Sequence, residues 1–319
     1  MAGTADFLDY WRVTRCELDA AFVQWIPRFF RELPQSETAA IHHALDNGKR
    51  LRGCLLCLVN QALGGRHEQA LPRAVAVECI QAASLIHDDF VDRDVQRRDR
   101  RAAWITYGPR KAVLLGDVMF ATALRRMVEA SRADGLAVAE VIAAMASGAW
   151  QEPLDPGDLD STLRADGAHG CDLYPTLIHL KTGVLFGTAT RLGAISAASV
   201  SQLADLAYDY GVHLGEAYQI ADDMHDLIGS DGADPGAASL AMLAPAVLHF
   251  CGPSALPGGD GAPLRMAPET LALLRERMHE AIRTRLRRAT ASARQLPDNR
   301  FTRLLQSAPS QVVGMIRTE

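Results

Sequence analysis

The sequence has no long apolar run typical of a membrane helix or a signal peptide. Its most apolar helical stretches are broken by charged residues such as Asp117 and Glu140, whereas a bilayer-spanning helix needs about 20 mostly apolar residues. The first residues, MAGTADFLDYWRVTR, contain no apolar core of the signal-peptide kind. We therefore expect no membrane span and a cytoplasmic location.

A strong excess of charge of either sign is also missing. The 319 residues carry 33 basic and 38 acidic side chains, for a formal net charge of −5. This balance is too mild to indicate nucleic acid or a membrane surface as a partner. Any electrostatic argument about function must therefore come from local clusters of charge.

The cysteine pattern of a structural zinc site is absent. Of the six cysteines, Cys54 and Cys57 form a C-x-x-C motif, and no second such motif or histidine pair completes a tetrahedral set. In a chain of this length without a signal peptide, we expect reduced thiols rather than disulfides. Because the motif lies in an apolar run, we expect both thiols in the core.

The polar and apolar alternation of β-strands is scarce as well. Apolar residues instead recur at three- and four-residue spacing through nearly the whole chain, which predicts an all-α fold. Gly/Pro-rich segments at 152–160, 229–237 and 251–263 predict loops, but we expect one domain over 1–319 because the helix after the last loop could not form a core alone. The expected helices are 5–32, 36–64, 68–96, 109–131, 134–151, 172–198, 200–229, 238–250, 267–295 and 299–307.

What the chain does contain is the motif D-D-x-x-D twice, in HDDFVDRD at 87–94 and in ADDMHD at 221–226. Positions i and i+4 share a helix face, so each motif presents two carboxylates side by side, which destabilises a helix. A divalent cation would neutralise them, and oxygen ligands without a nearby His or Cys pair favour Mg²⁺ bridging to substrate phosphates. The candidate metal ligands are Asp88, Asp89, Asp92, Asp222, Asp223 and Asp226.

The alternative is a pair of solvated acidic helix ends. Two copies of the motif, both after helices rich in apolar and small residues, make that interpretation less attractive than a metal site. An EF-hand is excluded because the loop glycine and the spaced D-x-D-x-D pattern are missing.

Basic residues flank these acidic segments. NGKRLRG at 47–53 and QRRDRR at 96–101 are arginine-rich, and one isolated lysine lies in the apolar run HLKTG. Arginine binds phosphate oxygens in a bidentate fork, and lysine acts as a point charge. Each cation alone is more often a solvated surface residue, but their position around two acidic clusters favours diphosphate binding. The cations concerned are Lys49, Arg52, Arg98 and Lys181.

These stretches together resemble the trans-isoprenyl diphosphate synthases, also called polyprenyl synthetases, from about residue 40 to about 250. The motifs agree in order and spacing. They are NGKRLRG, ECIQAASLIHDDFVDRDVQRRDR, AVLLGDVMF, LIHLKTGVLFGTATRLGA and GVHLGEAYQIADDMHD.

The resemblance implies a bundle of long helices around a central cavity, usually a homodimer. It implies ionisation of an allylic diphosphate, attack by the double bond of isopentenyl diphosphate, and loss of a proton. By the same resemblance, Asp88, Asp92 and Asp222 would hold three Mg²⁺ ions, with Asp89 and Asp226 in support. Separating a carbocation from pyrophosphate needs such electrostatic stabilisation and a dry cavity.

The resemblance also assigns the substrate contacts. Arg97 and Lys181 would bind the allylic diphosphate, and the oxygens of Thr182 and Gln219 would stabilise the carbocation; Lys181, Thr182 and Gln219 are therefore the expected catalytic residues. Isopentenyl diphosphate would be bound by Lys49, Arg52, Gln81 and Arg98.

The chain departs from the family pattern in three places. The family's R-R-G-x-P-T reads RRDRRA here, with Asp99 and Arg101 in place of Gly and Pro, and Asn47 replaces the first Gly of G-G-K-R. The segment 227–247 carries no lysine, although the family places lysines there against the allylic diphosphate. Loss of a buried phosphate contact costs on the order of 1.5–3 kcal/mol.

Three hypotheses follow from these features. The complete isopentenyl side favours chain elongation. The missing lysines favour a synthase-like enzyme that does not elongate, such as a terpene cyclase or a prenyltransferase to another acceptor. A non-catalytic regulatory subunit is disfavoured, because both aspartate clusters are complete.

Product length is set in this family by side chains just before the first cluster. Here they are Ala83 and Ser84, which are small and would leave the cavity open to a growing tail. We therefore expect a product longer than C15, with C20 geranylgeranyl diphosphate as the specific prediction.

Overall fold

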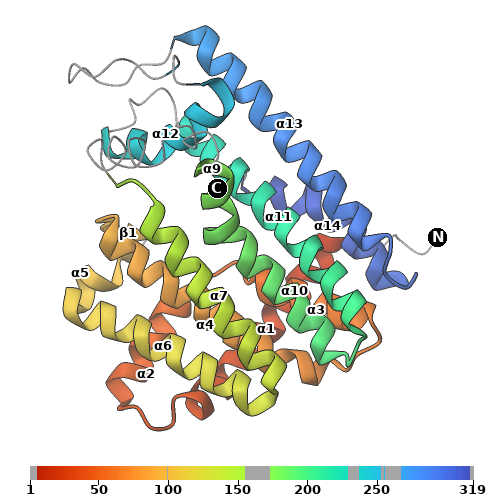
Figure 1. Cartoon of the computed structure of the whole chain (residues 1–319). Helices are drawn as coiled ribbons and strands as arrows, with labels where there is room; N and C mark the ends of the chain where they lie inside the picture. Colours follow the sequence, from red (N-terminus) through yellow and green to blue (C-terminus); the bar gives the residue numbers. More distant parts are fainter. Residues whose placement is uncertain are drawn as a thin grey trace.

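The computed structural model describes residues 6–98, 100–154, 173–228, 237–252, 255 and 267–316, without the side chains of 228 and 237–243. The predicted all-α class is confirmed: long helices pack around one another in Figure 1. The helices are α1 (Phe7–Phe29), α2 (Gln35–Leu45), α3 (Leu51–Ala62), α4 (His67–Val91), α5 (Ala103–Tyr107), α6 (Pro109–Ala130), α7 (Arg132–Gln151), α9 (Leu173–Ile178), the π-helical turn η2 (His179–Gly183), α10 (Val184–Ser196), α11 (Ser201–Ile228), α12 (Ala237–Cys251), α13 (Pro268–Ala293) and α14 (Arg300–Gly314).

The predicted helix over 36–64 is wrong, because the structure divides it into α2 and α3. The break lies at the NGKRLRG segment, where Asn47 and Arg50 have φ angles of 57° and 55°. Left-handed backbone cannot continue a helix, and Asn tolerates it better than most residues with a side chain. Asn47 therefore takes a backbone conformation that glycine commonly supplies, so its replacement of the family's glycine is compatible with the turn.

A short hairpin follows α4, where the sequence predicted only helix and loop. β1 (Gln96–Arg97) pairs antiparallel with β2 (Arg100–Arg101). Position 99, the aspartate that departs from the family pattern, lies outside the described residues. The indole Nε1 of Trp104 donates to the carbonyl of Asp94 at 2.7 Å and so fastens the base of the hairpin to α5.

The predicted helix over 172–198 is interrupted by the π turn η2, which contains Lys181 and Thr182. Such turns insert one extra residue into a helix and occur often at functional sites. Here the turn changes which side chains of the segment face α7 and α11, and the two residues concerned are both predicted site residues.

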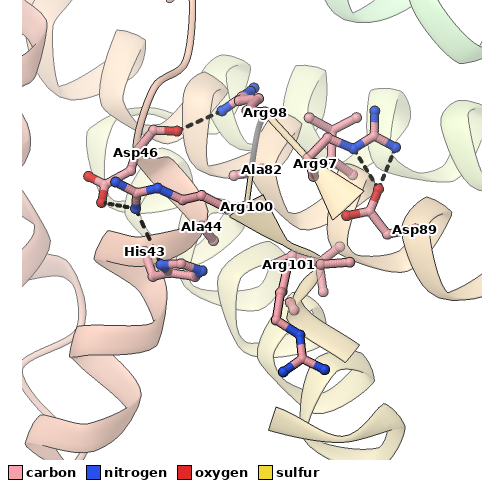
Figure 2. A pocket seen from close by; sticks show the side chains of 13 residues that line it. His43, Ala44, Asp46, Ala82, Asp89, Arg97, Arg98, Arg100 and Arg101 are labelled. Atoms are coloured by element: carbon pink, nitrogen blue, oxygen red, sulfur yellow. Dashed lines mark hydrogen bonds and ion pairs between the residues drawn. The ribbon is translucent and has the colours of Figure 1, made fainter. Parts of the chain in front are cut away.

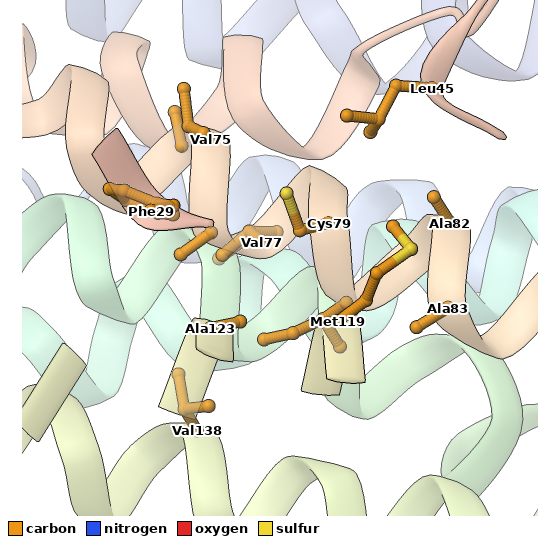
Figure 3. Close-up of a cluster of buried hydrophobic side chains, with 14 of the residues drawn as sticks. Phe29, Leu45, Val75, Val77, Cys79, Ala82, Ala83, Met119, Ala123 and Val138 are labelled. Carbon is orange, nitrogen blue, oxygen red and sulfur yellow. The ribbon is translucent and has the colours of Figure 1, made fainter. Parts of the chain in front are cut away.

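The core is built around α4, whose middle stretch from Ala74 to Ile80 is continuously buried. On α4, Cys79 and Ala83 are 0% exposed, and Met119 of α6 faces the same stretch (Figure 3). Cys54 and Cys57 are also 0% exposed, so their predicted place in the core is confirmed. Burial raises the pKa of both thiols.

Within the described residues, α7 alone has the length and mean hydropathy of a membrane-crossing helix. The core helix of a bundle can pass the same test. In α7, 39% of the most apolar 18-residue stretch is buried inside the protein. Its Asp134 is 0% exposed and forms a two-pronged ion pair with Arg73 of α4 at 2.7 and 2.9 Å. This buried pair fastens α7 to the bundle.

The bundle brings the carboxyl ends of α4 and α11 to the same end of the molecule. In Figure 1, α4 runs up to β1 and α11 runs up to α12. Each of these two helices carries one aspartate motif in its last turns, so the fold places both motifs at one end of the bundle.

Candidate active site

The first aspartate cluster closes α4. Asp92 is the C-cap residue of this helix, and its backbone N–H donates to the carbonyl of Asp88 at 2.8 Å. Burial raises the pKa of Asp88, and it raises that of Asp92 to about 6, against the opposing charge of Lys181. Both carboxylates are therefore held where their negative charge is poorly solvated, which is the condition under which a cation is bound most readily.

The second cluster, on α11, has the same property. Burial and then the charge of Asp222 raise the pKa of Asp226 to about 6, although solvent reaches this side chain. The charge of Asp94, just after the first cluster, adds to this increase. The two acidic segments are thus close enough to interact electrostatically, as a clamp on one ligand requires.

The middle aspartate of each motif is bound to protein rather than presented to a ligand. Asp89 is 3% exposed and accepts a hydrogen bond from Nε of Arg97 at 2.6 Å. Asp223 accepts from the hydroxyl of Tyr174 at 2.6 Å and from Nε2 of Gln219 at 2.8 Å. This arrangement favours a supporting role for both, and burial raises the pKa of Asp223 to about 7.

Thr182 and Gln219, the predicted carbocation-facing pair, are in contact. The hydroxyl of Thr182 donates to Oε1 of Gln219 at 2.6 Å. Gln219 in turn donates to Asp223, so a chain of hydrogen bonds runs from η2 to the second aspartate cluster and ends at Tyr174. Tyr174 was missed in the sequence, where nothing distinguished it from a core aromatic.

Lys181 is paired with a residue that the sequence analysis did not single out. Its ammonium forms an ion pair with the carboxylate of Glu152 at the end of α7. Burial opposes its charge, but Glu152 and then Asp88 raise the pKa of Lys181 overall. The lysine therefore stays protonated beside the first cluster.

Of the four residues predicted to bind isopentenyl diphosphate, Lys49 lies on the turn before α3 and Arg52 lies in the first turn of this helix. Nζ of Lys49 is 3.4 Å from the hydroxyl of Tyr218, and the guanidinium of Arg52 lies 4.3 Å from the centre of the Phe186 ring. Nε of Arg52 is buried without a hydrogen-bond partner, and burial lowers the pKa of this residue to about 10. An anion would satisfy both conditions. Gln81 lies two turns before Asp88 on α4 and is half-buried.

Glu78 is a second residue that sequence reasoning missed. It is 6% exposed, and its Oε1 accepts from the backbone N–H of Gly53 at 2.8 Å. Its charge raises the pKa of Arg52 and of Arg98, against the larger effect of burial. A buried glutamate thus holds the first turn of α3 and partly balances the cations around it.

The hairpin arginines surround a small cavity of about 50 Å³, which Figure 2 shows from close by. Arg98 has φ 52°, and its Nη1 donates to the carbonyl of Asp46 at 3.1 Å. Arg100 donates to the Asp46 carboxylate at 2.8 Å, so the hairpin is tied to the residue that ends α2. Arg101, which replaces the family's proline, points away from the other arginines in Figure 2.

The carboxylates suit Mg²⁺ better than a cation whose ligands must all come from protein side chains. Among the side chains that the structure describes, no three carboxylate, imidazole or thiolate groups converge on one metal position. Mg²⁺ usually takes one or two carboxylates and completes its octahedron with water and substrate phosphate. The paired i and i+4 carboxylates of the two motifs fit that requirement.

Comparison with known proteins places the chain in a family. The family model described as polyprenyl synthetase matches residues 34–234. The chain is 32% identical over 203 residues to a geranylfarnesyl diphosphate synthase of Aeropyrum pernix, covering 60% of this chain and 61% of that protein. It is 30% identical over 217 residues to a geranylgeranyl diphosphate synthase of Methanosarcina mazei, covering 66% of this chain and 64% of that protein.

The matched part thus spans a little over three fifths of the length of these relatives. Other relatives bear the names hexaprenyl and farnesyl diphosphate synthase, so the names cover several product lengths. A crystal structure of a decaprenyl diphosphate synthase from Rhodobacter capsulatus superimposes with a TM-score of 0.76 at 24% identity, over 97% of this chain and 99% of that one. The chain therefore belongs to the polyprenyl synthetase family.

Proposed function

We propose that the protein is a Mg²⁺-dependent trans-prenyltransferase that condenses an allylic diphosphate with isopentenyl diphosphate. The observation that carries the proposal is the pair of aspartate clusters at one end of the bundle, close enough for Asp94 to influence Asp226, with Lys181 beside the first cluster. Family membership supports the same reaction.

The allylic diphosphate would be held by the outer aspartates. Asp88 and Asp92 on one side, and Asp222 and Asp226 on the other, would bind three Mg²⁺ ions, with Asp89 and Asp223 holding their neighbours in place. Bound Mg²⁺ supplies the positive charge that stabilises the departing pyrophosphate. Lys181 and Arg97 add fixed positive charge at the same end, and this charge is worth most where water is excluded.

The carbocation would lie against Thr182 and Gln219. Their hydrogen bond at 2.6 Å leaves the amide and hydroxyl oxygens oriented by the protein rather than by water. On the other side of the reaction, Lys49, Arg52, Gln81 and Arg98 would bind isopentenyl diphosphate. The buried and unsatisfied Nε of Arg52 supports an anion at that position.

For the product we propose C20 geranylgeranyl diphosphate. Ala83 is small and 0% exposed, and Met119 of α6 is a bulky side chain of the same buried cluster that lies near it in Figure 3. A tail that passes Ala83 would therefore meet Met119. The relatives' names, which range from farnesyl to hexaprenyl, leave this length to be measured.

A second candidate is a family member that acts on a prenyl diphosphate without isopentenyl diphosphate. The lysine-free segment 227–247 motivates it, and residues 229–236 together with Arg265, the next cation, lie outside the described residues. The arginine and lysine positions on the isopentenyl side favour elongation over this candidate.

The deciding experiment incubates purified protein and Mg²⁺ with dimethylallyl, geranyl or farnesyl diphosphate, each with and without isopentenyl diphosphate. Mass spectrometry identifies the products. We expect longer prenyl diphosphates that require isopentenyl diphosphate. Hydrocarbons or alcohols formed without it would replace elongation with the second candidate.

We further propose that the chain is one domain, is cytoplasmic and forms a homodimer. α6 and α7 leave apolar side chains exposed, including Leu114 at 51%, Val128 at 57% and Leu136 at 50%. Exposed apolar side chains on adjacent helices are what a subunit interface would cover.

A further inference from the structure

Glu152 occupies the end of α7, directly beside the first aspartate cluster. It caps the helix in an extended conformation, with φ −75° and ψ 125°. Its carboxylate pairs with the ammonium of Lys181, and the two side chains are only 14% and 23% exposed. An ion pair so shielded from water is more strongly coupled than one on an open surface.

The backbone holds the two partners together. α7 approaches η2 so closely at Gly148 that a side chain there would place its Cβ 2.7 Å from Cβ of Leu180 and 3.2 Å from the backbone nitrogen of Lys181. Such contact leaves no room for a larger residue. The pair therefore follows from how α7 and the π turn pack, and does not depend on a flexible surface rotamer.

Glu152 also acts on the predicted metal ligands. Its charge, added to the larger effect of burial, raises the pKa of Asp88 and of Asp92, while Lys181 opposes it. The Lys181 ammonium thus lies under the influence of three carboxylates, those of Glu152, Asp88 and Asp92. A diphosphate that reaches Lys181 must compete with Glu152 for it.

We propose that Glu152 is a positioning residue of the diphosphate site: it holds the Lys181 ammonium by their ion pair until Mg²⁺–diphosphate binds and takes over this contact. This inference rests on the proposed function. Because Glu152 competes with diphosphate for Lys181 and attracts Mg²⁺, it sets the balance between the two affinities.

The proposal predicts opposite changes in two affinities for Glu152→Gln, which removes the charge and keeps the shape. Pyrophosphate in the presence of saturating Mg²⁺ should bind about threefold to tenfold more tightly, because Lys181 loses its competing partner. The Mg²⁺ concentration for half-maximal binding should rise by about twofold to fivefold, because one carboxylate near the metal is lost. General damage to the site would weaken both.

The experiment is calorimetric titration of the full chain with inorganic pyrophosphate at several Mg²⁺ concentrations. The matched control is Glu140→Gln, an exposed carboxylate on the same helix, which should change neither affinity. Glu152→Asp keeps the charge and should keep the wild-type Mg²⁺ requirement. In a Lys181→Ala background, Glu152→Gln should change pyrophosphate affinity by less than about twofold, because coupled residues are not additive.

Glu152→Gln that leaves pyrophosphate affinity unchanged or weakens it, in a protein with normal thermal unfolding, would overturn the proposal. The same holds if its effect persists without Lys181. Failure of the wild-type chain to bind pyrophosphate with Mg²⁺ would instead overturn the proposed function itself.

Discussion

At the scale of single residues, the aspartates within each D-D-x-x-D motif have two different roles. Asp88, Asp92 and Asp226 lie where burial raises their pKa. The middle aspartates are hydrogen-bonded, Asp89 to Arg97 and Asp223 to Tyr174 and Gln219. Helix geometry explains the division, because i and i+4 share a face while i+1 points about 100° away. The same motif thus supplies ligands and the supports that orient them.

Asp88→Ala should abolish nearly all activity. The variant removes a carboxylate that the proposal gives to Mg²⁺, and losing electrostatic stabilisation of the leaving group should lower kcat/KM on the order of 10³-fold or more. Steady-state kinetics with farnesyl and isopentenyl diphosphate measure it. Asp205→Ala, an exposed carboxylate of α11 paired with Arg191, is the control and should behave as wild type. Near-normal turnover by Asp88→Ala would refute the metal assignment.

The raised pKa of Asp92, about 6 against an ordinary value near 4, predicts a pH-dependent stability. Between those values the folded protein keeps a proton that the unfolded chain has released, so this group lowers the free energy of unfolding as pH rises from about 4 to above 6. Without metal, Asp92→Asn should therefore raise Tm at pH 8 by about 2–4 °C and change it little near pH 4.5.

Thermal unfolding in chelator at both pH values measures this effect. Adding Mg²⁺ and pyrophosphate at pH 8 should stabilise the wild type more than the variant. If the variant is no more stable than wild type at pH 8 in chelator, the ionised Asp92 carboxylate does not destabilise the metal-free protein.

Tyr174→Phe should weaken catalysis without unfolding the protein. The change removes one hydroxyl from a 5% exposed ring and leaves Asp223 with one hydrogen bond fewer. A hydrogen bond to a charged group contributes about 1.5–3 kcal/mol. Its loss should leave the hydrogen-bonded chain Asp223–Gln219–Thr182 less well oriented, so we expect kcat to fall about tenfold. Unchanged kcat would mean that this chain does not depend on Tyr174.

At the scale of elements, three interruptions of helical structure coincide with the site. The left-handed residues Asn47 and Arg50 lie in the NGKRLRG segment, the hairpin β1–β2 carries the arginines, and η2 contains Lys181 and Thr182. Each departure from regular helix turns side chains toward one end of the bundle. Local breaks of this kind are expected where function outweighs regular packing.

The contact between α4 and α6 should set product length. Met119→Ala removes a 0% exposed side chain opposite Ala83, so the product should lengthen beyond that of wild type, at a cost of about 2–5 kcal/mol in stability. Ala83→Phe should shorten it. Mass spectrometry of the products measures both changes.

Met127→Ala is the matched control for the α6 variant. Met127 is 1% exposed on the same helix, two turns farther from the aspartates, so it should cost similar stability while leaving the main product unchanged. Unchanged product length in both Met119→Ala and Ala83→Phe would place the floor of the cavity elsewhere.

At the scale of the whole molecule, helices outside the family match hold the site in place. The indole of Trp11 on α1 donates to the carbonyl of Lys49 at 2.8 Å, and Asp19 pairs with Arg50 at 2.9 Å. From the other end of the chain, Arg285 of α13 pairs with Glu216 at 2.9 Å. Both ends of the chain therefore support segments that bear site residues.

The proposed homodimer makes a further prediction at this scale. Leu136→Asp and Leu114→Asp place charge on exposed apolar positions of α7 and α6, so the double variant should shift the sedimenting species from twice the mass of one chain to one. Analytical ultracentrifugation measures the change. Val13→Asp, on an exposed position of α1, is the control and should leave the assembly unchanged. A wild-type chain that sediments as a monomer would contradict the proposal.

The sequence by itself determined the helical class, the extent of most helices and the six aspartates, because periodicity and motif spacing are local properties. It did not reveal the split between α2 and α3, the hairpin, or η2, since φ angles at Asn47 and Arg50 depend on what surrounds them. Only the tertiary structure paired Lys181 with Glu152 and Asp223 with Tyr174, residues 29 and 49 positions apart. Such partners are chosen by packing between helices, and no local pattern encodes them.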